Sequence, residues 1–268
     1  MIIHNPKAAT NDEKYPHTIK CVIFDNDGTL LDTLPIYYQV LEHFVPPPFP
    51  EGLVHRVNGV SDYDACKIFI EVFKMPMTAD ELYSERKKVL AELLPKAKIL
   101  PGVKSTVNRL HDEFKLPLAV ATGSTKDIHQ LKISSSKEHI ELFKSFDFSV
   151  CGDDVSVAKP NPEIFLETAK RLCSKYNYVF SDKKGLDANS KEENVIYPEN
   201  ILVVEDALNG IVAATSAGMA SVFVLNDSDE KDFQTKFKEK NVLPTFALKT
   251  LEDFPFDKFT FQSLSNNS

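Results

Sequence analysis

Acidic and hydroxyl side chains follow four apolar runs of this 268-residue sequence, at the point where each run ends. The clusters are Asp25-Asn26-Asp27, Thr122-Gly123-Ser124, Gly152-Asp153-Asp154 and Glu205-Asp206. If the four carboxylates of the first and last clusters meet, they repel one another unless a cation lies between them. Carboxylate oxygens in a partly open site suit Mg²⁺, which also binds the phosphate of a substrate. The clusters therefore predict a site for Mg²⁺ and a phosphate group.

Lys159 is the residue that we expect to balance this negative charge. A phosphate dianion cannot approach several carboxylates unless positive charge compensates them. Mg²⁺ supplies two positive charges, Lys159 is predicted to supply a third, and backbone N–H groups after the strands add donors. A single lysine is more often a surface residue, and Thr122 alone would be a routine strand-end hydroxyl. The proline after Lys159 and the presence of the other clusters favour a functional interpretation of both residues.

The apolar runs predict the elements that position these clusters. Near-continuous runs of β-branched and other apolar residues alternate with helical patterns, and we interpret the runs as strands. They lie at residues 21–24, 118–121, 148–151, 201–204 and 221–225. This alternation is typical of a parallel sheet covered by helices on both faces, an α/β fold with a Rossmann-like core. Ligands bind such sheets at the carboxyl ends of the strands, so the four clusters are expected to converge on one edge.

Residues 34–99 show helical patterns only and predict a small all-helical cap inserted after the first strand. A helix is expected to begin near Thr33, and the prolines of 46–50 end it. Ser61 is a predicted N-cap, and Thr78-Ala79-Asp80-Glu81 has the spacing of a capping box.

The rest of the chain is predicted to form the core domain, which comprises residues 20–33 and 100–268. Residues 1–19 are polar and are interpreted as an N-terminal lead-in. Residues 174–200 are also polar and aperiodic, and we interpret them as an exposed insertion without catalytic content.

The composition is that of an ordinary globular protein, with 43% hydrophobic and 26% charged residues. A net charge of −8 disfavours a broad surface for nucleic acid. The four cysteines lack zinc-binding spacing and are predicted to be buried thiols. No run approaches the ~18 apolar residues of a membrane span, and the N-terminus lacks the pattern of a signal peptide. We therefore expect a monomeric cytoplasmic protein that binds a small phosphorylated metabolite, with no nucleic acid or membrane partner.

Four segments resemble, in order, the motifs of the haloacid dehalogenase-like (HAD) superfamily. Asp25-Asn26-Asp27-Gly28-Thr29 resembles the first motif, Thr122 the second, and Lys159 in Ala158-Lys159-Pro160 the third. Glu205-Asp206-Ala207-Leu208-Asn209-Gly210 resembles the fourth, and the resemblance covers about residues 20–226. The helical insertion after the first motif is similar to the small cap of one HAD class. As a set, the four motifs are far more specific than any one of them.

The resemblance implies a role for each of these residues. Asp25 would be the nucleophile that attacks phosphorus and also a ligand of Mg²⁺. Asp27 would protonate the leaving alkoxide and later activate water, and its backbone carbonyl would bind the metal. Asp206 and Glu205 would complete the metal site. The phosphate would be bound by Asn26, Thr122, Gly123 and Lys159.

Within the superfamily, the sequence is most similar to the pseudouridine-5′-phosphatase-like branch, in segments such as Met75-Pro76-Met77 and Gly152-Asp153-Asp154. This resemblance implies a phosphatase for a small phosphate monoester such as pseudouridine 5′-phosphate. Glycerol-phosphate and sugar-phosphate phosphatases are the alternatives. Asp27 argues against a dehalogenase, because a leaving halide needs no proton.

Two further classes are less favoured. A β-phosphoglucomutase-like phosphotransferase must bind a second phosphate, and Asp62 replaces the arginine that the mutase uses for this purpose. A non-catalytic HAD scaffold would not need the intact set Asp25, Asp27, Lys159 and Asp206.

Several other polar residues are interpreted as structural. The basic residues Arg86, Lys87 and Lys88 are predicted to form a solvated face of a cap helix. Tyr37, Tyr38 and His55 are predicted to pack within the protein rather than contact a substrate. Asp153 and Asp154 are expected either to orient Lys159 or water, or to shape their loop.

Overall fold

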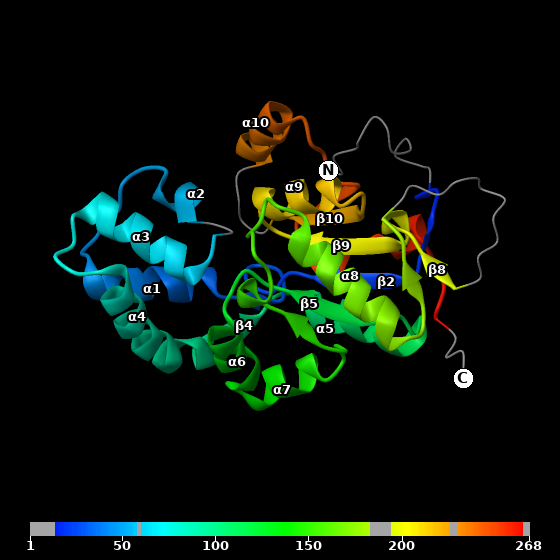
Figure 1. The fold of residues 1–268 in the computed structure, drawn as a ribbon, viewed down its shortest axis with the longest axis horizontal. Coiled ribbons are helices and arrows are strands. Elements are labelled where there is room, and N and C mark those ends of the chain that lie inside the picture. The colour runs from blue at the N-terminus through cyan, green and yellow to red at the C-terminus, as the bar shows by residue number, and fades with distance from the viewer. Residues whose placement is uncertain (1–13, 58–59, 183–193, 226–229, 265–268) are drawn as a thin grey trace.

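A six-stranded parallel sheet forms the centre of the molecule (Figure 1). The computed structural model describes residues 14–57, 60–182, 194–225 and 230–264. The strand order is β11-β10-β9-β2-β5-β6, and every neighbouring pair is parallel. The strands are β2 (Cys21–Phe24), β5 (Leu118–Ala121), β6 (Ser149–Val150), β9 (Ile201–Glu205), β10 (Ala220–Val224) and β11 (Phe246–Leu248). The predicted α/β fold is confirmed, and β11 is a strand that the sequence patterns did not predict.

The first apolar run lies in the middle of the sheet. β2 pairs with β9 on one side and β5 on the other, in registers that set Phe24 opposite Val204 and Val120. Every residue of these three strands is buried, which explains why their sequences are almost entirely apolar. The residues that follow the three strands therefore emerge side by side, with Asp25-Asn26-Asp27 between the other two clusters.

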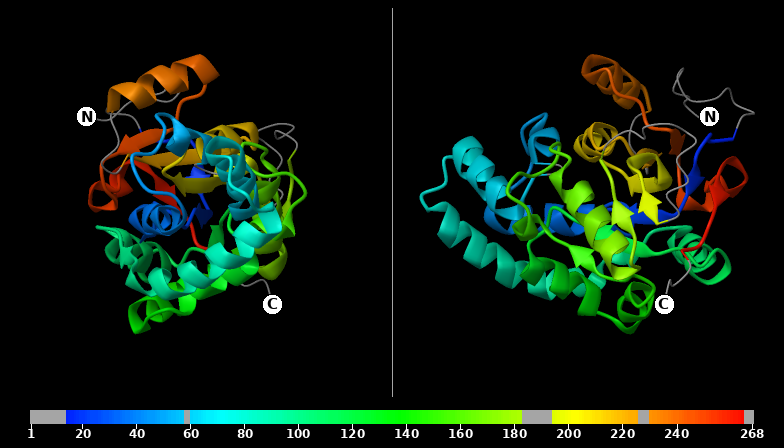
Figure 2. Two further views of the ribbon diagram at one scale, coloured as in Figure 1. Left: turned by 90° about the vertical axis from the view of Figure 1, so that its left-hand side faces the viewer. Right: turned by 45° about the vertical axis from the view of Figure 1, so that its right-hand side comes forward.

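Alternate strand residues pack into two apolar cores, one on each face of the sheet, as the two-residue period of a strand requires. Val22 and Phe24 pack with α5 (Val103–Asn108), which continues into a π-helical turn at Arg109–Glu113. Ile23 packs on the opposite face with α8 (Glu163–Lys175) and α9 (Leu208–Ser216). Figures 1 and 2 show the helices on both faces of the sheet. The other helices of this part are α6 (Lys126–Ser134), α7 (Lys137–Phe143) and α10 (Glu230–Lys240).

Of the α-helices between β2 and β5, the first four form a separate group at one end of the molecule (Figures 1 and 2). They are α1 (Leu34–Phe44), α2 (Leu53–Val57), α3 (Asp62–Phe73) and α4 (Ala79–Leu93). The predicted start signals are confirmed: α1 follows Thr33, the Ser61 hydroxyl accepts a hydrogen bond from Asp64 N, and Thr78 and Glu81 form a capping box.

Two short strands join this helical group to the sheet. β3 (Leu31–Asp32) and β4 (Lys98–Ile99) form an antiparallel pair in which Leu31 lies opposite Ile99. The chain therefore leaves and re-enters the core at neighbouring points. Ile128 of α6 packs against apolar residues of α1 and α4, so the group also contacts the core directly.

Two regions interpreted as irregular contain regular structure. The end of the predicted lead-in, Thr18–Ile19 (β1), pairs with Thr260–Phe261 (β12), whereas residues 1–13 lie outside the described part. Within the predicted insertion, Val179–Phe180 (β7) pairs with Val195–Ile196 (β8), and residues 183–193 are not described. Each pair is only two residues long, too short to produce a recognisable period in the sequence.

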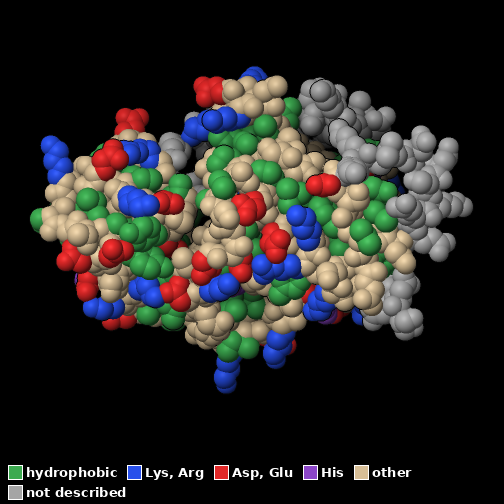
Figure 3. Space-filling model, in the orientation of Figure 1, with side chains coloured by type: hydrophobic (Ala, Val, Ile, Leu, Met, Phe, Trp, Pro, Cys, Tyr) green, Lys and Arg blue, Asp and Glu red, His purple; other side chains and the backbone are tan. Residues whose placement is uncertain are grey.

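The surface drawn in Figure 3 carries Lys and Arg side chains interspersed with Asp and Glu side chains. Among the helices that the structure describes, none is both long enough and apolar enough to cross a membrane. All four cysteines are buried and unpaired, as predicted.

Candidate active site

Three buried carboxylates meet where β2 and β9 end. Asp25 follows β2 directly, Glu205 is the last residue of β9, and Asp206 follows it. The Asp25 backbone N–H donates to Val204 O over 2.9 Å, which holds the two strand ends together. One carboxylate oxygen from each of the three residues lies within 4.8 Å of the others.

Lys159 reaches into this group from the loop before α8. Its Nζ donates to Asp25 Oδ1 over 2.6 Å, to Glu205 Oε1 over 2.9 Å and to Ala121 O over 3.1 Å. Burial alone would lower the pKa of Lys159, but Asp25 and Glu205 raise it above its ordinary value. The ammonium group therefore stays charged in the enclosed site.

The carboxylates remain in excess over this single ammonium group. Burial raises the pKa of the Asp25 carboxyl to about 7, although Lys159 opposes the rise. Burial and the charges of Glu205 and Asp25 also raise the pKa of Asp206. Three enclosed carboxylates beside one lysine thus fit a divalent cation with a preference for oxygen ligands.

Asp27 is held in a second network, centred on a lysine that the sequence analysis missed. Lys132 Nζ lies 2.6 Å from Asp27 Oδ1, 2.7 Å from its Oδ2 and 2.6 Å from Ser124 Oγ. Thr33 Oγ1 donates to Asp27 Oδ1 over 2.7 Å, and Ser124 Oγ donates to Oδ2 over 3.2 Å. Burial alone would raise the pKa of the Asp27 carboxyl, but Lys132 outweighs burial and holds the pKa below its ordinary value.

One signal in the sequence could have identified Lys132. It lies one helical turn after Ile128 in α6, and Ile128 is fully buried. Residues four apart share a helix face, so Lys132 belongs to the buried stripe rather than to the solvated side.

The predicted phosphate-binding residues lie around Asp25, but their side chains differ in environment. Gly123 and Ser124 line the same cavity as Asp25. The Thr122 hydroxyl is buried and accepts a hydrogen bond from Ser124 N over 3.2 Å. The Asn26 side chain is fully buried, and both its amide atoms lack a hydrogen-bond partner. Asn26 does not line the cavity, so any contact of this residue with phosphate would come from its backbone N–H.

Two glycines give the acidic side chains their space. A Cβ on Gly28, whose φ is +81°, would lie 2.1 Å from Asp206 Oδ2. A Cβ on Gly210 would lie 1.7 Å from Glu205 Oε1. Both carboxylates are anchored, since Thr29 Oγ1 donates to Asp206 and Ala207 N donates to Glu205. A larger residue at either glycine would have to displace an anchored carboxylate.

We expect Gly28→Ala to destabilise the protein by about 3 kcal/mol, from left-handed backbone strain plus displacement of Asp206. Gly52→Ala is the matched control, because Gly52 has a φ of +77° and nothing lies within 4 Å of its Cβ position. This control should lose only the strain, about 1 kcal/mol. Chemical denaturation measures both free energies of unfolding. Equal losses of stability in the two variants would show that the Asp206 carboxylate can move aside without destabilising the protein.

A largely apolar cavity connects the acidic group to the four cap helices. Its core end is formed by Asp25, Asp27, Gly123, Ser124, Lys159, Glu205, Asp206 and Ala207. Its cap side is formed mainly by apolar and aromatic side chains, among them Tyr37, Tyr38, Phe49 and Phe69, together with the charged residues Asp62 and Arg86. Tyr37 and Tyr38, which are predicted to pack within the protein, therefore also line the cavity. The side chain of His55 lies outside the described part of the structure.

The prediction of a solvated basic face on α4 is wrong for Arg86. This side chain is 3% exposed, and its Nη1 donates to Asp62 O and to Cys66 Sγ, each over 3.2 Å. Lys87 and Lys88 do lie at the surface, where they pair with Asp127 and Glu85.

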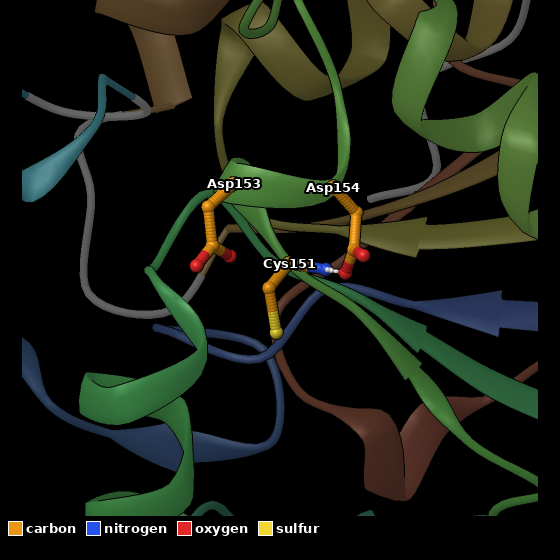
Figure 4. A group of neighbouring side chains, drawn as sticks. All are labelled: Cys151, Asp153 and Asp154. Carbon is orange, nitrogen blue, oxygen red and sulfur yellow. Dashed lines mark hydrogen bonds between the residues drawn. The ribbon is translucent and has the colours of Figure 1, made fainter.

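A second acidic group consists of Cys151, Asp153 and Asp154 (Figure 4). The Asp154 carboxylate accepts a hydrogen bond from Cys151 N over 3.0 Å and pairs with Lys126 and Arg171. Asp153 accepts a hydrogen bond from Lys126 N over 3.1 Å. Burial raises the pKa of the Cys151 thiol to about 12, which disfavours the thiolate that a metal would need. These contacts fix the loop after β6, the second of the two roles expected for the aspartates.

Comparison with known proteins places these features in a family. A sequence model of haloacid dehalogenase-like hydrolases matches residues 22–224. The probable pseudouridine-5′-phosphatase of Drosophila melanogaster is 32% identical over 244 residues, which cover 88% of this chain and 92% of the fly protein. (DL)-glycerol-3-phosphatase 2 of Arabidopsis thaliana is 31% identical over 227 residues, which cover 82% of this chain and 84% of the plant protein.

A solved structure shows the same fold. β-Phosphoglucomutase from Clostridium difficile aligns over 90% of this chain and 95% of its own, with a TM-score of 0.65. The two sequences are 21% identical, so this likeness concerns the fold alone.

This chain has a Rossmann-like parallel sheet, a helical cap, and carboxylates and a lysine near the ends of the strands. These features together are typical of one class of hydrolytic enzymes. The chain belongs to the haloacid dehalogenase-like hydrolase family.

Proposed function

We propose that the chain is a phosphatase that hydrolyses a small phosphate monoester through a phosphoryl group carried by Asp25. The observation that supports this most is the position of Asp25, which lines the cavity and is bound by Lys159 over 2.6 Å. A carboxylate oriented by a buried ammonium group at a cavity wall is suited to nucleophilic attack.

The reaction would proceed in two steps that use two aspartates. In the first, an Asp25 oxygen bonds to phosphorus, the bond to the leaving alkoxide breaks, and Asp27 gives that alkoxide its proton. In the second, Asp27 takes a proton from water, whose oxygen attacks phosphorus and releases Asp25 and inorganic phosphate. Because Lys132 favours the ionised form of Asp27, it supports the second step, in which Asp27 is the base.

Lys159 would stabilise the charge that develops on the phosphate oxygens. It already contacts Asp25 Oδ1, so it can bridge the nucleophile and the transferred group. We assign the remaining phosphate contacts to Thr122, Gly123 and the backbone of Asn26.

Asp25, Asp206, Glu205 and the backbone carbonyl of Asp27 would hold Mg²⁺. When bound, the ion supplies two positive charges that offset the carboxylates and the phosphate. The donor set fits this assignment, since it contains only oxygen atoms and its carboxylates outnumber its single lysine.

For the substrate, we infer a phosphorylated small molecule such as pseudouridine 5′-phosphate, with glycerol and sugar phosphates as alternatives. Relatives with similar identity are named for pseudouridine 5′-phosphate and for glycerol 3-phosphate, so the reaction transfers more securely than the substrate. A mutase activity is disfavoured because Asp62 in the cavity would repel a second phosphate. The intact set of acidic residues and Lys159 disfavours a non-catalytic scaffold.

Removal of divalent metal is the direct test of this proposal. We expect dialysis against a chelator to lower release of inorganic phosphate from p-nitrophenyl phosphate by at least about 100-fold, and added Mg²⁺ to restore it. Circular dichroism of the chelated sample controls for unfolding. Undiminished release by the metal-free, folded protein would contradict the proposal.

A further inference from the structure

Two charged residues of the cap helices, Asp62 and Arg86, line the cavity among apolar side chains. Asp62 is the first residue of α3 and Arg86 lies in the middle of α4. Both line the cavity that contains Asp25, and both are more than nine-tenths buried. Neither residue contacts the acidic group at the strand ends in a hydrogen bond or an ion pair of the described residues.

Asp62 has an unused hydrogen-bond acceptor. Its Oδ2 is enclosed and has no hydrogen-bond partner, although the residue is only 7% exposed. A buried carboxylate oxygen without a donor is unfavourable, because it has lost its hydration without replacement. Because Asp62 lines the cavity, a ligand that binds there is an available source of the missing donor.

Arg86 provides a donor beside this acceptor. Its Nη1 donates to Asp62 O over 3.2 Å, so the guanidinium group lies next to the start of α3. Its Nε has no hydrogen-bond partner. A structural role alone, joining α3 to α4, accounts for Nη1 and leaves the free Nε–H and the free Asp62 Oδ2 unexplained.

The surroundings of the pair are flat and apolar. Tyr37, Tyr38, Phe49 and Phe69 line the same cavity, and the Arg86 guanidinium lies 5.0 Å from the centre of the Phe69 ring. Burial and then the nearby charge of Asp62 raise the pKa of the Tyr37 hydroxyl, which places Tyr37 close to the pair. Aromatic side chains around one acceptor and one donor suit a planar ring with a polar edge.

We propose that Asp62 and Arg86 select the leaving group, and that this group is a nucleoside whose base presents an N–H next to a carbonyl. The ring N–H would donate to Asp62 Oδ2, and Arg86 Nε–H would donate to the adjacent carbonyl. The imide edge of a pyrimidine base of the uracil type has this pattern. The inference rests on the proposed phosphatase activity at Asp25.

Smaller or more highly charged leaving groups fit the pair less well. Glycerol and ribose offer hydroxyl donors to Asp62, but they have no planar face for the four aromatic side chains. A second phosphate would be attracted by Arg86 but repelled by the unpaired oxygen of Asp62. A donor next to an acceptor on a planar ring satisfies both residues without adding charge.

Three phosphates with the same ribose 5-phosphate unit test this proposal on the Mg²⁺-supplied enzyme. They are pseudouridine 5′-phosphate, its 1,3-dimethyl analogue, which has lost both ring N–H groups, and ribose 5-phosphate, which has no base. We expect kcat/KM for pseudouridine 5′-phosphate to exceed that for each of the other two by at least about tenfold. Because this comparison uses the wild-type protein, it does not depend on whether any variant folds.

Asp62→Ala should then lower kcat/KM for pseudouridine 5′-phosphate about tenfold and bring its ratio to the dimethyl analogue close to one. Asp64→Ala is the matched control: it removes a carboxylate two residues later in the same helical turn, where the side chain is 49% exposed. Asp64→Ala should keep the wild-type ratio.

The outcomes separate this inference from the proposed function. If wild-type protein releases phosphate equally fast from all three compounds, or faster from glycerol 3-phosphate, the assignment of Asp62 and Arg86 is wrong and the phosphatase proposal stands. If none of these compounds, nor p-nitrophenyl phosphate, releases phosphate with Mg²⁺, both fail. A ratio that changes equally in Asp62→Ala and Asp64→Ala would show a general effect of charge near α3 and overturn the assignment.

Discussion

Asp25→Asn is expected to lower phosphate release by at least about 10⁴-fold, because an amide cannot replace the carboxylate that attacks phosphorus. The substitution preserves shape, and Lys159 keeps Glu205 as a charged partner. The expected loss is therefore chemical rather than structural. Initial rates at saturating substrate and Mg²⁺ measure it.

Asp32→Asn provides the control for this variant. Asp32 lies seven residues later, pairs with Lys98 through the backbone of β3 and β4, and does not line the cavity. Although Asp32 is partly buried, the substitution preserves its shape, and the variant should keep wild-type activity within about twofold. Undiminished turnover by Asp25→Asn would overturn the proposal that Asp25 is the nucleophile, regardless of the result for Asp32→Asn.

The same variant has an expected effect on stability in the absence of metal. The pKa of Asp25 is about 7 in the folded protein, against about 4 for an unperturbed aspartate. Between these values the unfolded chain loses the proton first, so ionisation of Asp25 reduces wild-type stability as pH rises from about 4 to about 7. Asparagine carries no such proton, and the stability of the variant relative to wild type should increase between about pH 4 and about pH 7. Urea unfolding in chelator measures this difference, and a constant difference would contradict it.

The edge of the sheet where the acidic residues meet could be predicted because each of its signals is local. Each strand is a short apolar run that ends directly on its polar cluster, as Phe24 does on Asp25. The sheet has both faces covered, so these runs contain few polar residues that would obscure them. The helix starts at Ser61 and Thr78 were equally accessible, since a cap and its partner lie within three residues of each other.

Arg86 shows where local signals were insufficient. The helix α4 carries Leu82, Val89, Leu90 and Leu93, and these residues are compatible with two different phases of the helix. The buried stripe of α4 is Leu82, Arg86 and Leu90, at intervals of four residues. A stripe through Leu82, Val89 and Leu93 places Arg86 among the solvated lysines. Only the packing of α4 against α3 distinguishes the two phases.

The position of Lys132 one turn after Ile128 indicates that it is buried, but its role could not be assigned because its partner is distant in the sequence. Its ion pair joins residues 105 positions apart, and a lysine in a polar helix is usually exposed. The topology brings the two residues together, since β5 lies beside β2 and Ser124, just before α6, contacts Asp27. The short edge strand β11 was missed for a related reason, because Phe246–Leu248 is recognisable as a strand only from its pairing with β10.

Lys132→Met is expected to destabilise the protein by about 3 kcal/mol, the low end of the cost of breaking a buried ion pair, because the Asp27 side chain is 23% exposed. Lys132 is fully buried, and its removal leaves the Asp27 carboxylate with hydroxyl donors only. Phosphate release should also fall by about 10²–10³-fold, because the proposed acid–base group loses the cation that positions it. Denaturation and steady-state kinetics measure the two effects. Lys126→Met removes an exposed lysine at the start of the same helix and should change stability by less than about 1 kcal/mol.

A double variant identifies the cause of the lost stability. In Asp27→Asn/Lys132→Met both charges of this pair are gone, so loss of Lys132 no longer leaves the Asp27 carboxylate without its counter-ion. If the unpaired charge is the main cost, the double variant should be more stable than Lys132→Met by about 2 kcal/mol or more, a coupling typical of residues in direct contact. It should remain inactive, since an amide in place of the Asp27 carboxyl cannot exchange a proton with the substrate. A double variant as unstable as Lys132→Met would instead assign the loss to the packing of the lysine stem against Tyr37, whose ring centre lies 5.2 Å from Lys132 Nζ.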